Sequence, residues 1–187
     1  MPAASLATLR ALYADDPDPW RFRTSDYERA KFEATVAAMP RPRYGTILEV
    51  GCGNGELGRR LASCCDRYIG IDAVPEALTE ARRAVPGGTF ACRFLPAPLP
   101  DADLVVVSEV LYFLDARGIG ALAAQWRAAT PAPDLLSVNW LGDSGHALDG
   151  PRALETLRAA LSPTHRSRVV SATRHYRIDV LQPYGDA

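Results

Sequence analysis

The chain has 187 residues, enough for one domain with a sizeable hydrophobic core. Its formal net charge of −1 offers no general attraction to nucleic acid, and its four cysteines have neither disulfide-type nor Cys-x-x-Cys zinc spacing. No signal-type start is present, and no window reaches the roughly 20 apolar residues that span a membrane. We therefore expect a soluble, cytoplasmic protein that needs no metal, with buried cysteines.

The first part of the chain is predicted to be helical. Apolar residues recur at helical spacing over 5–13 and again over about 25–39, with an Asp- and Pro-rich break at 15–19. We interpret residues 1–42 as a helical preface that precedes the main fold. A short apolar run, 46–50, then ends at a glycine and predicts the first buried strand.

From that strand onward, helices and strands alternate. We expect helix 55–63, strand 67–71, helix 75–84, strand 89–93, strand 104–107, helix 119–129, strand 135–140 and helix 152–161. Two final strands, 167–173 and 176–182, are joined by a turn and predict an antiparallel hairpin. The order predicts a doubly wound α/β fold in one domain, 1–187, whose core (43–187) holds a seven-stranded, mostly parallel sheet.

A glycine-rich turn follows the first strand. Gly51, Gly53 and Gly55 allow a sharp turn and a close approach of backbone N–H groups to a ligand. A plain tight turn or a dinucleotide fold would look similar. However, Glu56 stands where the dinucleotide fingerprint has its third glycine, and a carboxylate facing a diphosphate would repel it. A ligand with an ammonium group and no phosphate suits this turn better.

Asp72 is the candidate partner of that turn. It ends the second strand, 21 residues after Gly51, a distance suited to gripping a ribose with both hydroxyls free. Hydrogen bonds of this charge-assisted kind contribute about 1.5–3 kcal/mol each, so Asp72 should govern ligand affinity. The alternative is that Asp72 only caps the helix that begins at Pro75.

The run Ile-Leu-Glu-Val-Gly-Cys-Gly-Asn-Gly over 47–55, together with Asp72, resembles the cofactor motif of class I S-adenosylmethionine-dependent methyltransferases. The resemblance covers about residues 45–182. It implies a Rossmann-like fold with S-adenosyl-L-methionine as the cofactor. In that family the carboxylate matching Glu49 orders the turn, and the one matching Asp72 holds the ribose. The implied cofactor residues are Glu49, Gly51, Cys52, Gly53, Gly55, Asp72, Ala73, Phe94 and Leu95, the last two flanking the adenine.

A narrower resemblance rests on Asp-Pro-Asp-Pro-Trp at 16–20, Thr-Ser-Asp-Tyr-Glu at 24–28, Lys-Phe at 31–32 and Ser-Glu-Val-Leu-Tyr-Phe-Leu at 108–114. These segments are similar to the nodulation-type N-methyltransferases, which methylate an amino group on a chitooligosaccharide. The resemblance implies N-methylation of a small acceptor, an amino sugar or similar amine. Open alternatives are an O-methyltransferase, a catalytically silent cofactor-binding module and, least of all, a nicotinamide oxidoreductase.

Further candidate residues follow the later strands, at the sheet edge where open α/β folds bind ligands. Ser108 and Glu109 come after the fourth strand, and Glu109 could meet the cofactor ammonium, meet the acceptor or remain solvated. Tyr112 could line the transfer cavity or simply pack. His146 lies in the loop after the fifth strand, where a histidine is more often solvated than basic. We name Glu109, His146 and Tyr112 as catalytic candidates.

Two aromatic residues of the preface complete the predicted site. Trp20 and Tyr27 would contribute to a lid over the cofactor if the preface folds across the ligand edge of the sheet. The alternative for Trp20 is a hydrophobic anchor that fixes the preface to the core.

Overall fold

The computed structural model describes residues 6–185, and their strands form one sheet in the order β3-β2-β1-β4-β5-β7-β6. The strands are β1 Tyr44–Val50, β2 Cys65–Asp72, β3 Thr89–Cys92, β4 Leu104–Ser108, β5 Asp134–Trp140, β6 His165–Ala172 and β7 Tyr176–Pro183. The strands β1 to β5 pair in parallel, and β7 is antiparallel to both of its neighbours. The predicted seven-stranded sheet with a C-terminal hairpin is confirmed.

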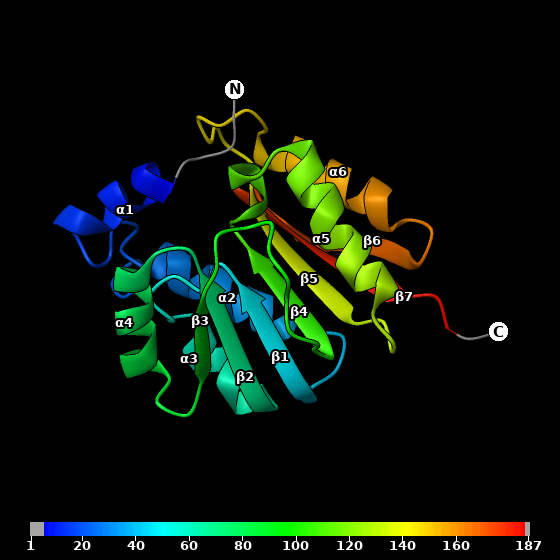
Figure 1. Cartoon of the computed structure of the whole chain (residues 1–187), viewed down its shortest axis with the longest axis horizontal. Coiled ribbons are helices and arrows are strands. Elements are labelled where there is room, and N and C mark those ends of the chain that lie inside the picture. Colours follow the sequence, from blue (N-terminus) through cyan, green and yellow to red (C-terminus); the bar gives the residue numbers. More distant parts are fainter. Residues whose placement is uncertain (1–5, 186–187) are drawn as a thin grey trace.

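Helices cover both faces of this sheet (Figure 1). They are α1 Leu6–Asp15, α2 Asp26–Ala37, α3 Gly58–Leu61, α4 Pro75–Ala84, α5 Ala116–Ala128 and α6 Gly150–Leu161, with 3-10 turns η1 Ala62–Cys64 and η2 Leu111–Phe113. Polar caps fix several starts: Ser25 accepts a hydrogen bond from Glu28 N, and Asp149 accepts one from Arg152 N. Such caps satisfy backbone donors that have no partner inside the helix.

The two faces follow from the two-residue period of a strand. In β1, Leu48 and Val50 point into the core beneath α5 and α6, whereas Ile47 points into the core beneath α2 and α3. In β4, Val105 and Val107 belong to the first core and Leu104 and Val106 to the second, so both strands are buried on both faces, which is typical of central parallel strands. In Figure 1, α5 and α6 lie side by side, and α4 flanks β3 at the other end of the sheet.

The strand order places a ligand crevice at a definite point. The chain runs outward from β1 to β2 and β3, and then returns to the other side of β1 to form β4. The connections after β1 and β4 therefore leave in opposite directions, which opens a crevice between the carboxyl ends of these strands. The glycine turn after β1 and Ser108 at the end of β4 flank this crevice.

Several sequence expectations need correction. The helix expected over 55–63 is only α3, Gly58–Leu61, followed by η1, because Gly55 has a positive φ of 83° and keeps the preceding segment in turns. The cysteines are not all buried: Cys92 is exposed, since β3 is the edge strand. The helix expected from residue 5 begins one residue before the described range. Within 6–185, no helix is both long and apolar enough to cross a bilayer.

Candidate active site

The turn after β1 takes its shape from its glycines. Gly51 and Gly53 have positive φ angles of 79° and 52°, which residues with a side chain rarely adopt. Gly51 N and Cys52 N donate hydrogen bonds to Ile71 O at 2.9 and 3.0 Å, which hold the turn against the end of β2. Gly51 and Gly53 both line the large cavity of the crevice.

Asp72 ends β2 and links this turn to the next helix. Its Oδ2 accepts a hydrogen bond from Gly53 N at 2.9 Å, and its Oδ1 accepts one from Val74 N, just before α4, at 3.0 Å. Burial raises the pKa of the Asp72 carboxyl, and the backbone donors oppose that rise. Because a carboxylate offers about four lone-pair sites, each oxygen can still accept a further bond from the cavity. Asp72 therefore fixes the segment before α4 without capping the helix itself, and it lines the cavity as well.

The cavity has a volume of about 550 Å³, within the range of small-molecule sites. The core contributes Gly51, Gly53, Ile71, Asp72, Ala73, Val74, Arg93, Phe94, Leu95, Ser108, Glu109, Val110, Tyr112, Phe113, Leu114, Trp140, Asp143, Ser144 and His146 to its walls. The preface contributes Leu9, Leu12, Tyr13, Trp20, Phe22, Tyr27, Glu28 and Lys31. The preface therefore forms one side of the site.

Aromatic side chains of the preface pack on the core and on one another: the Tyr27 ring meets Trp140 of β5 edge-on at 6.5 Å between centroids. The Trp20 ring stacks on Phe22 at 5.7 Å between centroids, and Tyr13 meets Trp20 edge-on at 5.4 Å. Trp20 lines the cavity but keeps 40% of its surface exposed, so it lies at the cavity mouth. Its position is compatible with both the lid and the anchor interpretations.

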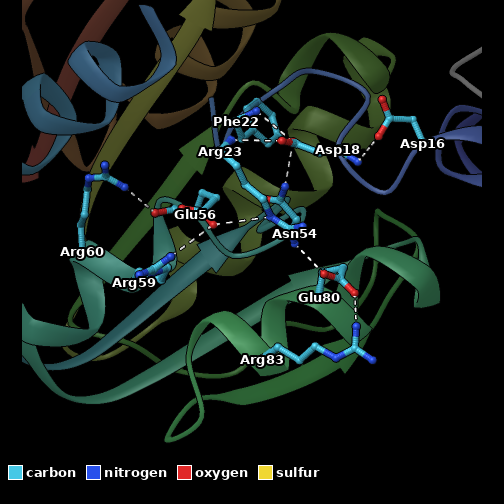
Figure 2. Close-up of polar contacts among 10 residues, drawn as sticks. All are labelled: Asp16, Asp18, Phe22, Arg23, Asn54, Glu56, Arg59, Arg60, Glu80 and Arg83. Carbon is cyan, nitrogen blue, oxygen red and sulfur yellow. Dashed lines mark hydrogen bonds and ion pairs between the residues drawn. The ribbon is translucent and has the colours of Figure 1, made fainter. Parts of the chain in front are cut away.

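A set of polar contacts, which we call the clasp, joins residues 18–23 to the glycine turn and α4 (Figure 2). Asp18 Oδ1 accepts a hydrogen bond from Asn54 Nδ2 at 2.9 Å, and Asn54 is buried. Arg23 pairs with Glu80 at 2.6 Å and lies 3.8 Å from Glu56. The clasp therefore connects the preface directly to the turn that borders the cavity.

The clasp also explains where the side chain of Glu56 lies. The sequence suggested that this carboxylate would face the ligand. Instead, Glu56 pairs with Arg23 and Arg59 and is not among the residues that line the large cavity. The chain still lacks the third glycine of a dinucleotide fingerprint. However, Glu56 does not line the cavity, so its carboxylate would not directly repel a diphosphate bound there.

Opposite charges meet at the floor of the cavity, in a group that we call the charged floor: Glu28, Lys31 and Glu109. Lys31 Nζ donates to Glu28 Oε1 at 3.2 Å and to Glu109 Oε1 at 3.1 Å. Glu28 and Lys31 are buried, with 8% and 3% of their surfaces exposed. Burial raises the pKa of Glu28, an effect that Lys31 opposes and Glu109 reinforces.

Three hydrogen-bond donors fix the carboxylate of Glu109. Its Oε2 accepts hydrogen bonds from Tyr112 Oη at 2.9 Å and from Trp140 N at 3.0 Å, while Oε1 receives Lys31. Its backbone φ of 57° lies in the left-handed region, which is costly for a residue with a side chain. The surrounding contacts thus fix Glu109 in one orientation, with its carboxylate bridging β4, β5 and α2.

An aromatic wall faces the charged floor. His146 stacks on Tyr112 with an interplanar angle of 15°, and its ring centroid lies 4.6 Å from that of Phe113. Burial and the neighbouring Glu109 raise the pKa of Tyr112, which keeps its hydroxyl protonated as a donor. The aromatic wall can therefore keep water away from a reacting group that lies beside the carboxylates of the charged floor.

The structure brings most of the predicted site residues together. The cavity is lined by Trp20, Tyr27, Gly51, Gly53, Asp72, Ala73, Phe94, Leu95, Ser108, Glu109, Tyr112 and His146. Three others, Glu49, Cys52 and Gly55, lie behind this lining. Cys52 is buried against Leu78 and Ala81 of α4. A Cβ on Gly55 would lie 2.8 Å from Ala81 Cα, so this glycine permits close packing of the turn on α4.

Glu49 is buried within the core. Its Oε2 accepts a hydrogen bond from Tyr68 Oη at 2.6 Å, across β1 and β2. Burial is the largest effect on this carboxyl and raises its pKa to about 8, against the opposing hydrogen bond from Tyr68. Its hydrogen bond is therefore with β2, and Glu49 is not among the residues that line the large cavity.

Sequence reasoning missed Glu28 and Lys31 as site residues, although both belong to segments quoted for the family resemblance. The signal was present in α2, whose buried residues Glu28, Lys31, Phe32 and Thr35 recur at helical spacing. Two charges within the buried stripe of a helix require a partner elsewhere in the fold. That partner, Glu109, lies 78 residues away from Lys31 in the sequence.

The strand order, the crevice beside β1 and β4, and the glycine turn next to Asp72 are those of the class I S-adenosylmethionine-dependent methyltransferases. The match of a family model narrows the class. The model described as "Nodulation protein S (NodS)" matches residues 6–125 of this chain. The chain therefore belongs to the nodulation protein S family.

Individual relatives agree with this membership. Nodulation protein S of Rhizobium tropici is 34% identical over 113 residues, which cover 56% of this chain and 46% of that protein. Methyltransferase nsrG of Aspergillus novofumigatus is 29% identical over 179 residues, which cover 91% of this chain and 59% of that one. The chain thus spans about half the length of the curated relatives that it matches.

A solved structure shares the fold. It is N-methyltransferase NodS from Bradyrhizobium japonicum WM9 in complex with S-adenosyl-L-homocysteine, with a TM-score of 0.76 and 22% identity. The match covers 95% of this chain and 97% of that one. At this identity the likeness establishes the shared architecture.

Proposed function

We propose that this chain is an S-adenosylmethionine-dependent N-methyltransferase that acts on a small primary amine, with an amino sugar as the first candidate. The observation that carries the proposal is the composition of the cavity. It joins the glycine turn and Asp72 to a charged floor in which two carboxylates face one lysine. An excess of acidic groups favours cationic ligands, both a sulfonium cofactor and an ammonium acceptor.

The residues of the cavity fit this cofactor. Asp72 keeps acceptor capacity for ribose hydroxyls, and the backbone at Gly51 and Gly53 lets a ligand approach without side-chain obstruction. Phe94 and Leu95 supply apolar surface for an adenine ring. When bound, the cofactor supplies an electrophilic methyl group on a positively charged sulfur.

The role of the protein in such a transfer is mainly positional. Alignment of reactants can lower a barrier by roughly 7–11 kcal/mol, so the cavity must hold the acceptor nitrogen in line with the methyl group. The aromatic wall of Tyr112, Phe113 and His146 would exclude water from that point. The preface would close the cavity through the clasp.

The family supports the choice of acceptor. The matching family is named for nodulation protein S, and the solved relative is named as an N-methyltransferase. An O-methyltransferase would need no excess of carboxylates at its acceptor site. We therefore place the amine first and the hydroxyl acceptor second.

A matched pair of acceptors tests the proposal. Glucosamine and N-acetylglucosamine share the same hydroxyls, but only glucosamine has a free amine. We expect S-adenosylhomocysteine to form from S-adenosylmethionine with glucosamine or its short oligomers and not with the N-acetylated sugars. Equal turnover of both sugars would favour O-methylation, and turnover of no amine in a panel would contradict the proposed function.

A further inference from the structure

The charged floor contains a carboxylate oxygen without a hydrogen-bond donor. Among residues 6–185, Glu28 Oε2 is buried and has no hydrogen-bond partner, and the same is true of the Tyr27 hydroxyl. Lys31 Nζ lies 3.0 Å from Oε2, but its hydrogen bond goes to Oε1. Both Tyr27 and Glu28 line the cavity. Buried polar atoms normally have partners, so these two groups suit a ligand that supplies donors.

Glu28 and Glu109 differ in their capacity to receive such a ligand. Glu109 already accepts three hydrogen bonds, from Lys31, Tyr112 and Trp140 N. Glu28 accepts one, from Lys31. An ammonium group carries three N–H donors and no acceptor. It complements the Tyr27 hydroxyl oxygen and a carboxylate oxygen that is paired with Lys31 at 3.0 Å but accepts no hydrogen bond. Glu28 is therefore the better amine site of the two.

We propose that Glu28 binds the ammonium group of the acceptor and takes its proton, with the Tyr27 hydroxyl beside it and Lys31 as a positioning residue. The inference rests on the proposed function and names the residue that the amine meets. It moves the role of proton acceptor from Glu109 and His146 to Glu28. Glu109 instead holds Lys31 and thereby the geometry of the floor.

The proposed reaction consists of deprotonation of the acceptor amine followed by methyl transfer. The acceptor enters as R–NH3⁺, and one proton moves to Glu28 Oε2, which leaves a neutral carboxylic acid and a lone pair on nitrogen. That lone pair forms the N–C bond to the methyl carbon as the C–S bond breaks and its electron pair stays on sulfur. The product is a protonated secondary amine, and Glu28 then releases its proton to solvent.

The surroundings of Glu28 make its carboxylate more basic than that of an ordinary glutamate. Burial is the largest effect and raises the pKa of Glu28, as do the charges of Glu109 and Asp18, whereas Lys31 lowers it. The hydroxyls of Tyr27 and Tyr112 face the same floor and stay protonated, because burial raises the pKa of both. A carboxyl with a raised pKa is a stronger base than an ordinary glutamate once ionised.

The test compares Glu28→Gln with Glu33→Gln, which changes an exposed glutamate on the same helix. With S-adenosylhomocysteine at saturation, calorimetry measures the affinity of glucosamine and of N-acetylglucosamine. We expect the wild type and Glu33→Gln to prefer glucosamine. Glu28→Gln should lose that preference by at least about tenfold while its affinity for S-adenosylhomocysteine stays unchanged. An unchanged preference in Glu28→Gln would overturn the proposal.

The pH dependence of the rate distinguishes the loss of the proton acceptor from a structural defect. For Glu28→Gln, kcat/KM for glucosamine should be strongly reduced at pH 7 and should rise about tenfold per pH unit as free amine increases. Glu28→Asp keeps the carboxylate and should recover part of the rate and the amine preference. If Glu28→Gln fails to fold, the Asp variant decides: a partial rate and a partial amine preference in that variant, with Glu33→Gln unchanged, support the site, and either an unaltered amine preference or its complete loss in a folded protein contradicts it.

The outcomes also separate this inference from the proposed function. If the wild type turns over no amine but prefers glucosamine through Glu28, the amine site stands and the methyltransferase proposal fails. If the wild type and Glu28→Gln methylate glucosamine alike, the proposed function stands and Glu28 is not the proton acceptor.

Discussion

Three carboxylates of the cavity differ in how their oxygens are engaged. Asp72 receives two backbone N–H groups, Glu109 receives three donors, and Glu28 receives only Lys31. Because a hydrogen bond that a carboxylate already accepts restricts where a ligand can bind, this count distinguishes their roles. We propose on this ground that Asp72 combines a structural role with ligand binding, that Glu109 is mainly structural and that Glu28 receives the acceptor.

The first prediction concerns Asp72. Asp72→Ala should weaken S-adenosylhomocysteine binding at least tenfold, about 1.4 kcal/mol, because the ribose hydroxyls lose their acceptor. It should also loosen the glycine turn, since Gly53 N loses its partner. Calorimetry on the folded variant measures the change, and Asp72→Asn, which retains one acceptor oxygen, should lose less. An affinity equal to wild type in Asp72→Ala would remove Asp72 from the site.

The sequence predicts which residues line the cavity best where a local pattern carries the signal. Gly51, Gly53 and Asp72 were identifiable because the turn and the strand end lie within one β-α-β unit. Glu28 was not, because its role depends on Lys31 and on Glu109, which meets α2 only in the folded chain. Gly55 was assigned to the ligand, whereas its contact is with α4, a packing that no spacing reveals.

Among the elements, the described part of the preface (residues 6–42) both lines the cavity and contacts the core. It contributes eight of the cavity residues, and its charged contacts with the core include the clasp and the pair of Arg10 with Glu76. We propose that it acts as a lid. The clasp would then slow the escape of a bound ligand, since the bond between Asp18 and Asn54 ties the preface to the glycine turn.

The second prediction tests the clasp. Asn54→Asp replaces the buried amide donor with a carboxylate that faces Asp18, so repulsion should open the preface. The dissociation rate of S-adenosylhomocysteine, measured by stopped flow, should rise at least about tenfold. Arg23→Ala removes an exposed ion pair and should have a much smaller effect, which salt also diminishes. Identical rates in wild type and Asn54→Asp would show that the clasp does not control ligand release.

The order of helices and strands was predictable because apolar periodicity is strong in this chain. The apolar run 104–107 predicts a buried strand, and the short turn between 173 and 176 predicts the antiparallel hairpin of β6 and β7. The length of α3 was not predictable. Its amphipathic pattern extends back to residue 55, but the positive φ of Gly55 delays the helix until Gly58.

For the whole molecule, the buried Glu49 links stability to pH. Its pKa is about 8 in the folded chain and about 4.5 as an ordinary glutamate, so the native state binds more protons than the unfolded state between these values. The free energy of unfolding should therefore fall as pH rises from about 5 to 8. The slope from this group is on the order of 1.4 kcal/mol per pH unit.

The third prediction follows from that sign. Glu49→Gln cannot ionise, so its unfolding free energy should change less between pH 5 and 8 than that of the wild type. Denaturant titrations at several pH values measure the difference, with Glu33→Gln as the control that keeps the wild-type slope. Parallel slopes for wild type and Glu49→Gln would contradict the raised pKa of Glu49.

If the chain is an N-methyltransferase, the transferred methyl group must be found on the nitrogen of the acceptor. The wild-type chain would be incubated with methyl-labelled S-adenosylmethionine and glucosamine, and fragment mass spectrometry with nuclear magnetic resonance would locate the label on the product. For an N-methyltransferase we expect a single label on the sugar nitrogen. A label on a sugar oxygen, or no labelled product from glucosamine or any amine of a panel, would contradict it.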